Sequence, residues 1–168
     1  MAKAHKYLVF QIQDSEKLMM ESLALMEKYV IDGKVQFVPH NFFDPQPSVA
    51  RGAAVYFLRN ILHDWNDAYC RKILRPLVEA MDKNSKLVIC DIVIPKTDRW
   101  PKVREAAVRG LDVFMLAFFN AKERNLDEWT EQLRSVDRRL KITRVFGAEE
   151  EGSQMRRDAV IEAQLVNT

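Results

Sequence analysis

The sequence predicts an α/β fold with a truncated Rossmann-like sheet, mostly parallel, helices on both faces and an antiparallel C-terminal hairpin. Short segments rich in β-branched and aromatic residues alternate along the chain with longer segments whose apolar residues recur at helical spacing. The last predicted strand alternates apolar and polar residues and follows its predecessor after a turn. That pattern is typical of an antiparallel edge strand or hairpin partner.

Four strands and two helices are expected before residue 95. Ser15 offers an N-cap for the first helix, which should end at residues 32–33, and Asn66 offers one for the second. Residues 87–94 form an almost continuous apolar run, as expected of a strand covered on both faces. The other expected strands are 7–13, 35–38 and 53–58.

Two more helices and two more strands are expected after residue 100. Pro101 suits the first turn of a helix whose apolar residues continue to Phe118. Asn125 and Glu128 resemble a capping box at the start of the next helix. Strands follow at 140–146 and 158–166, joined by a turn at 149–152.

The composition limits the class of protein. The 168 residues favour one domain, predicted over residues 1–168. The 26 basic and 24 acidic residues give a net charge of +2, which provides no electrostatic case for a nucleic-acid partner. No apolar run approaches the roughly 20 residues of a membrane span, and the N-terminus lacks a secretory pattern.

The cysteines and histidines favour a cytoplasmic protein without a metal. Cys70 and Cys90 lie in segments that are expected to be buried, so we interpret them as reduced core residues, with a disulfide as the alternative. They form no CxxC motif, and the three histidines are widely separated, so no metal site is expected.

Polar residues gather where the predicted strands end. Asp14 follows the first strand, Asn41 and Arg59 follow the next two, and Asp91 lies near the end of the fourth. Ligands of open α/β sheets bind at the carboxyl ends of the strands. The pattern favours a site for a small molecule at this rim, although boundaries between strands and loops collect polar residues in any protein.

One segment carries a resemblance to a known family. Residues 56–67, YFLRNILHDWND, resemble the LRxILHDWxD signature of plant and fungal O-methyltransferases that use S-adenosylmethionine. Residues 35–47 and 86–95 resemble the third- and fifth-strand segments of that family, and 114–124, FMLAFFNAKER, its substrate-side helix and following turn. The likeness runs from about Phe10 to the C-terminus.

The resemblance implies a catalytic histidine. His63 matches the residue that takes the proton from the substrate hydroxyl, and imidazole titrates near neutrality. Asp91 and Glu123 match two carboxylates that orient it, which would fix the tautomer and stabilise the imidazolium. The alternatives are a helix-entry histidine bonded to backbone and, for Glu123, a solvated charge between two basic neighbours.

The resemblance also implies contacts with ligands. Asp14 matches the acidic residue that binds the ribose of S-adenosylmethionine, while Asn41 and Phe42 match residues beside its adenine. Arg59 matches a basic residue near the cofactor. The substrate pocket of the family is lined at positions that match Leu116, Phe119 and Asn120, for which the alternative is ordinary helix core.

Two parts of the family pattern have no counterpart here. Only nine residues precede Phe10 and none is glycine, so nothing matches the first strand and its glycine-rich cofactor loop. Nothing matches the N-terminal helical dimerisation domain either. Without the first strand two strand edges are exposed. The strand at 7–13, a second chain in a homodimer or swapped assembly, or the rest of a longer protein could cover them.

Two functions are therefore expected. The first is methyl transfer from S-adenosylmethionine to a phenol- or enol-like hydroxyl of a small molecule in secondary metabolism. The alternative is a repurposed scaffold that needs no S-adenosylmethionine. It would use the same histidine and aspartate for cyclisation, elimination or isomerisation, or serve as a non-catalytic partner subunit.

Overall fold

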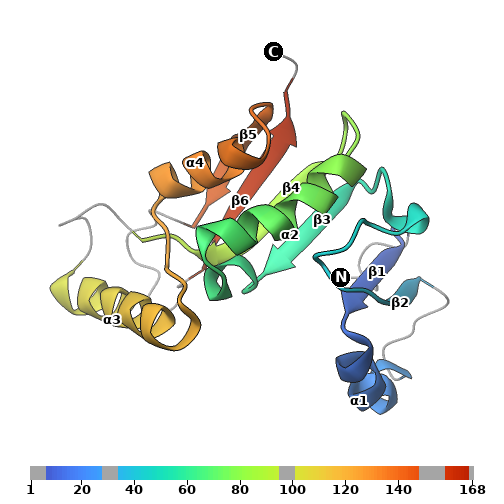
Figure 1. Ribbon diagram of the computed structural model, residues 1–168, viewed down its shortest axis with the longest axis horizontal. Coiled ribbons are helices and arrows are strands. Elements are labelled where there is room, and N and C mark those ends of the chain that lie inside the picture. Colours follow the sequence, from blue (N-terminus) through green and yellow to red (C-terminus); the bar gives the residue numbers. More distant parts are fainter. Residues whose placement is uncertain (1–6, 28–33, 95–100, 148–157, 167–168) are drawn as a thin grey trace. The chain divides into compact units, whose positions relative to one another are not determined.

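The computed structural model describes residues 7–27, 34–94, 101–147 and 158–166, in two compact units (Figure 1). The first unit is Met1–Ala50 and the second is Arg51–Thr168. The expected helix end at 32–33 and the expected turn at 149–152 lie outside the described residues. One domain over the whole chain stays a prediction.

The first unit contains a two-stranded parallel sheet. Its elements are β1 (Phe10–Asp14), α1 (Glu16–Glu27), β2 (Val35–Pro39) and the 3-10 turn η1 (Ser48–Ala50). Asp14 pairs with Pro39 at the carboxyl end, where the His40 amide donates to the Asp14 carbonyl at 2.8 Å. β1 starts three residues later than predicted, and among the described strands it pairs with β2.

The second unit contains a four-stranded mixed sheet in the order β3-β4-β6-β5. The β3–β4 pair is parallel, and β6 is antiparallel to both β4 and β5. The predicted α/β class and C-terminal hairpin are confirmed, but β6 lies inside the sheet rather than at an edge. It pairs with β4 on one side and β5 on the other, and its alternate side chains Ala159, Ile161 and Ala163 are buried on one face of the sheet. The strands are β3 (Val55–Arg59), β4 (Lys86–Ile92), β5 (Leu140–Phe146) and β6 (Asp158–Leu165).

Two helices lie side by side along this sheet in Figure 1: α2 (Asp67–Ala80) and α4 (Leu126–Val136). The apolar stripe predicted for α2 is buried, and it includes Ile73, Leu74 and Leu77. Leu133 of α4 is fully buried as well. Burial of each such side chain stabilises the fold by about 1.5–3 kcal/mol, so this layer holds the rim of the sheet in place.

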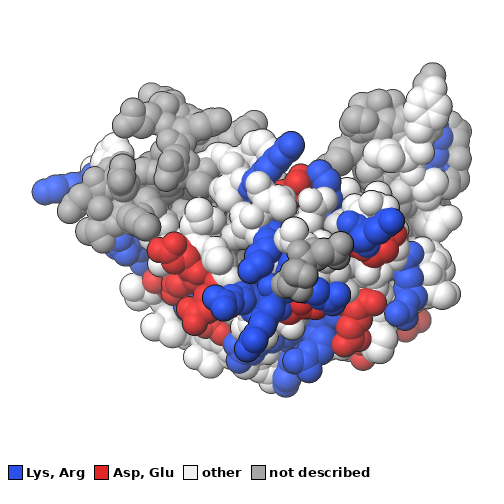
Figure 2. All heavy atoms as spheres, turned by 90° about the horizontal axis from the view of Figure 1, so that it is seen from above, with Lys and Arg blue, Asp and Glu red and all other residues white. Residues whose placement is uncertain are grey.

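The third helix is more exposed. α3 (Lys102–Phe119) packs Val108 and Leu111 against Ile92 and Ile94 at the end of β4. No helix within the described ranges is long and apolar enough to cross a membrane. On the face that Figure 2 shows, acidic side chains flank the basic ones.

A complete capping box begins α4, as the sequence predicted. The Asn125 side chain accepts from the Glu128 amide at 2.9 Å, and the Glu128 carboxylate accepts from the Asn125 amide at 2.9 Å. We expect Asn125→Ala to lower the free energy of unfolding by about 1 kcal/mol, because the partly buried Glu128 amide loses its acceptor. Urea unfolding would measure the loss. The exposed control Glu131→Ala should change stability by less than about 0.5 kcal/mol, and equal losses in both variants would contradict the capping role.

Candidate active site

The carboxyl end of β4 brings two chain segments together. The turn after α3 runs alongside that end, since Val93 forms a parallel bridge with Arg124 and the Ile94 amide donates to the Arg124 carbonyl at 2.9 Å. On the other side, Asn60 follows β3 with a φ of 51°, a left-handed conformation that asparagine tolerates, and its amide donates to Cys90 at 3.1 Å. The chain then enters the 3-10 turn η2 (Leu62–Asp64), which carries His63.

His63 contacts a buried carboxylate. Its Nδ1 lies 3.1 Å from Oε1 of Glu123, whose side chain is fully buried. The backbone amide of Glu123 donates to Asp112 Oδ1 of α3 at 2.8 Å, which fixes the turn. Glu123 is thus no solvated charge, and the alternative given for it is wrong. His63 Nε2 faces the half-exposed Asp64 carboxylate at 3.5 Å.

Charge and burial shift the protonation of this cluster. The hydrogen bond that His63 donates to the Glu123 carboxylate raises the pKa of His63, and burial opposes this rise. The negative charges of Asp91 and Asp64 raise the pKa of His63 further. Burial raises the pKa of Asp91 to about 7, opposed by the positive charge of His63. Neither Asp91 oxygen has a hydrogen-bond partner within the described residues, so its charged form is poorly solvated.

This arrangement can accept and hold a proton. A carboxylate on Nδ1 fixes the tautomer in which Nε2 carries the lone pair, and it stabilises the imidazolium that forms when Nε2 is protonated. Because the His63 side chain retains 17% exposure, a substrate hydroxyl can reach this ring.

The three residues expected to line a substrate pocket lie at the end of α3. Leu116 is 61% exposed and Phe119 is 50% exposed, so the alternative of ordinary helix core is wrong for both. Asn120 ends the helix in a left-handed conformation with φ 51° and is also exposed. These side chains leave apolar surface available at the turn that leads to Glu123.

Three of the four residues expected at the cofactor lie in the first unit. Asp14 ends β1, and Asn41 and Phe42 follow β2, so the parallel register places them at one rim. Asn41 Oδ1 accepts from the Phe43 amide at 3.2 Å, and the rings of Phe42 and Phe43 meet edge to face at 4.8 Å. Arg59 is exposed at the end of β3 in the second unit.

The sequence did not reveal a second group of interacting residues near His63, which is centred on Arg124. Arg124 is fully buried, and its side chain contacts Asp67 and Cys70 of α2. In the sequence Arg124 stands beside Lys122 and Glu123, a charged triplet typical of a solvated turn. No local signal distinguishes a buried arginine from an exposed one, because the α2 residues that its side chain contacts lie more than 50 residues away.

The fold and this cluster define an α/β protein with a histidine–carboxylate pair beside the carboxyl end of β4. The sequence model of the O-methyltransferase domain family matches residues 9–136, which is more than half of the chain. The chain belongs to the O-methyltransferase family. It is 40% identical over 164 residues to O-methyltransferase aurJ of Gibberella zeae, a match that covers 92% of this chain and 36% of the relative. The chain spans about a third of the length of that relative.

Two solved structures share the fold. A structure described as a pericyclic reaction enzyme is 28% identical, with a TM-score of 0.78 over 98% of this chain and 38% of that one. The O-methyltransferase NcsB1 from neocarzinostatin biosynthesis was solved with S-adenosyl-L-homocysteine and 1,4-dihydroxy-2-naphthoic acid. It is 25% identical, with a TM-score of 0.77 over 98% of this chain and 44% of that one.

Proposed function

We propose that this chain is the catalytic part of an O-methyltransferase of secondary metabolism that acts on a phenol- or enol-like hydroxyl of a small molecule. The buried Glu123 carboxylate 3.1 Å from Nδ1 of the partly exposed His63 carries this proposal. Such a pair is what a general base requires: a proton acceptor of near-neutral pKa with a fixed tautomer. Asp91, within the same cluster of charges, favours the protonated ring after the transfer.

The proposed reaction is a direct displacement. His63 Nε2 takes the hydroxyl proton while the substrate oxygen forms a bond to the methyl carbon. When bound, S-adenosylmethionine supplies this methyl group on a positively charged sulfur, and the broken carbon–sulfur bond leaves S-adenosylhomocysteine. Glu123 holds the imidazolium ring, and the rest of the protein contributes mainly by positioning the reactants.

The described residues fit the nucleoside half of that cofactor. The exposed Asp14 carboxylate can accept from ribose hydroxyls, and Phe42 offers an aromatic face for adenine beside the amide of Asn41. Arg59 is proposed to lie near the cofactor as well. Leu116, Phe119 and Asn120 are proposed to contact the substrate, because exposed apolar side chains beside an acid–base pair suit an aromatic ring.

One observation favours a second function for the same cluster. The likeness to a pericyclic reaction enzyme, at 28% identity, makes a rearrangement without methyl transfer the alternative. His63 and Asp91 would then exchange protons with the substrate, and the product would be an isomer or elimination product. The mass of the product separates the two, because methyl transfer alone adds one carbon.

Calorimetric titration of the chain with S-adenosylmethionine and S-adenosylhomocysteine tests the proposal. We expect binding in the micromolar range for both ligands, because Asp14, Asn41 and Phe42 offer polar and aromatic groups to the nucleoside half. Asp14→Asn should weaken both affinities by removing the ribose acceptor. Absence of binding at millimolar ligand would exclude methyl transfer by this chain alone and leave the alternative function.

We further propose that residues 1–168 act as one catalytic domain in a homodimer or swapped assembly in the cytoplasm. The position of β3 as the outermost strand of the described four-stranded sheet supports a partner strand there. Cys70 is a buried free thiol, which supports a reducing compartment.

A further inference from the structure

Arg124 carries a positive charge that is completely buried. Such a charge is tolerated only where partners replace the lost water. Its Nε and Nη2 donate to Asp67 Oδ1 at 3.1 and 2.8 Å. Its Cζ atom lies 5.2 Å from the centre of the Trp129 ring. The ion pair therefore ties the turn before α4 to the first residue of α2.

The remaining hydrogens of this guanidinium hold backbone on both sides of His63. Nη1 donates to the Leu62 carbonyl at 3.1 Å and Nη2 to the Trp65 carbonyl at 2.9 Å. The Cys70 Sγ lies 3.2 Å from each of the same two carbonyl oxygens, so its single S–H can donate to either of them. A guanidinium has five N–H groups in a rigid plane, so it can span both carbonyls and the carboxylate at once.

The backbone of Arg124 completes the connection. Arg124 directly follows Glu123 and pairs with Val93 and Ile94, two and three residues beyond Asp91. One residue thus joins the three segments that carry His63, Glu123 and Asp91. A displacement of the His63 turn by a fraction of an ångström would lengthen the 3.1 Å contact between Nδ1 and Oε1.

We propose that Arg124 is a positioning residue, whose guanidinium holds the His63 turn at hydrogen-bonding distance from Glu123. The proposal rests on the role of His63 proposed above. Arg124 does not touch the reacting atoms, and it acts through the geometry of the base.

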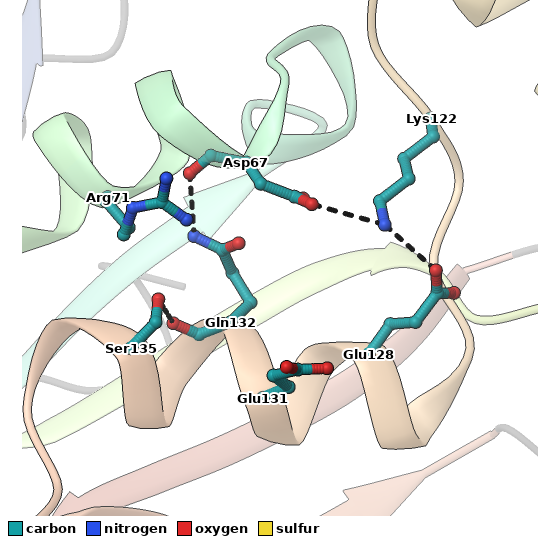
Figure 3. A pocket seen from close by; sticks show the side chains of 7 residues that line it. All are labelled: Asp67, Arg71, Lys122, Glu128, Glu131, Gln132 and Ser135. Atoms are coloured by element: carbon teal, nitrogen blue, oxygen red, sulfur yellow. Dashed lines mark hydrogen bonds and ion pairs between the residues drawn. The ribbon is translucent and has the colours of Figure 1, made fainter.

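Arg124→Lys tests this, because an ammonium group keeps the charge but cannot span both carbonyls and Asp67. The matched control is Lys122→Met, two residues away. Lys122 lies between Asp67 and Glu128, at 3.2 and 2.9 Å (Figure 3), and these two partners belong to α2 and α4 rather than to the His63 turn. Both variants change a basic side chain of the same turn that contacts Asp67.

The readout is the titration of the His63 ring, followed by NMR of isotope-labelled histidine and assigned against His63→Gln. We expect Arg124→Lys to lower the pKa of His63, because the bond with Glu123 is the largest cause of its elevation. Lys122→Met should leave it unchanged. In methyl transfer, Arg124→Lys should lower kcat by about tenfold to a hundredfold while KM for the cofactor changes little.

A folded Arg124→Lys protein with the wild-type titration of His63 would overturn the proposal. If that variant does not fold, Asp67→Asn replaces it, since Asp67 is 43% exposed and holds the guanidinium from the outer side. An unchanged titration in Asp67→Asn would also overturn the proposal. Methyl transfer that survives loss of the His63 imidazole would instead refute the base role, while a shifted titration would still support positioning.

Discussion

His63→Gln is expected to lower the rate of methyl transfer by about 10²- to 10⁴-fold, the range over which a positioned general base contributes. The amide of glutamine can still donate to the buried Glu123 carboxylate, so the fold retains that bond, but it cannot take a proton at neutral pH. The rate of product formation under saturating cofactor and substrate measures the effect.

Two controls make this result specific. Affinity for S-adenosylhomocysteine should stay within about threefold of wild type, because no cofactor contact is assigned to His63. The exposed variant Arg139→Gln, at the turn before β5, should keep full activity. A His63→Gln protein that transfers methyl groups within about threefold of the wild-type rate would refute the general base.

Asp91→Asn is expected to remove a large part of the dependence of stability on pH. Asp91 is fully buried with neither oxygen paired among the described residues, and burial raises its pKa from 3.8 to about 7. Between these two pH values the folded protein holds a proton that the unfolded chain has lost. Stability must therefore fall as pH rises through this window and level off above it.

The expected size of this fall is on the order of 4 kcal/mol, since each pKa unit corresponds to about 1.4 kcal/mol. His63 acts in the same direction: its raised pKa gives stability that is full below its unfolded value and lost as pH rises through its folded value. Urea unfolding of Asp91→Asn between about pH 4 and 8 should show a flatter profile than wild type.

Asp82→Asn is the matched control for this experiment. Asp82 is exposed just before β4, and the hydrogen bond from the Asn84 amide lowers the pKa of its carboxyl group. We therefore expect Asp82→Asn to lose stability as pH rises, as the wild type does. If Asp91→Asn follows the same pH profile as wild type, Asp91 is charged at lower pH than proposed, and the cluster offers no second proton acceptor beside His63.

The sequence by itself determined the features that depend on near neighbours. The capping box at Asn125 and the N-cap at Asn66 need only residues three positions apart, and both form as predicted. The strand at 140–146 has the predicted bounds, while the first strand starts later, at Phe10. Membership in the O-methyltransferase family could also be predicted from the sequence, because residues 56–67 and 114–124 resemble the segments of that family.

Only the tertiary structure decided which charges are buried. Glu123 meets His63 across 60 residues of sequence, and Arg124 meets Asp67 across 57. No local pattern encodes such distant partners, so a solvated charge stayed open from the sequence as the alternative interpretation of Glu123. β6 likewise entered the sheet between β4 and β5, because alternation predicts antiparallel pairing but not how many neighbours a strand acquires. Burial depends on the whole packed chain, and burial gives His63 and Asp91 their unusual protonation.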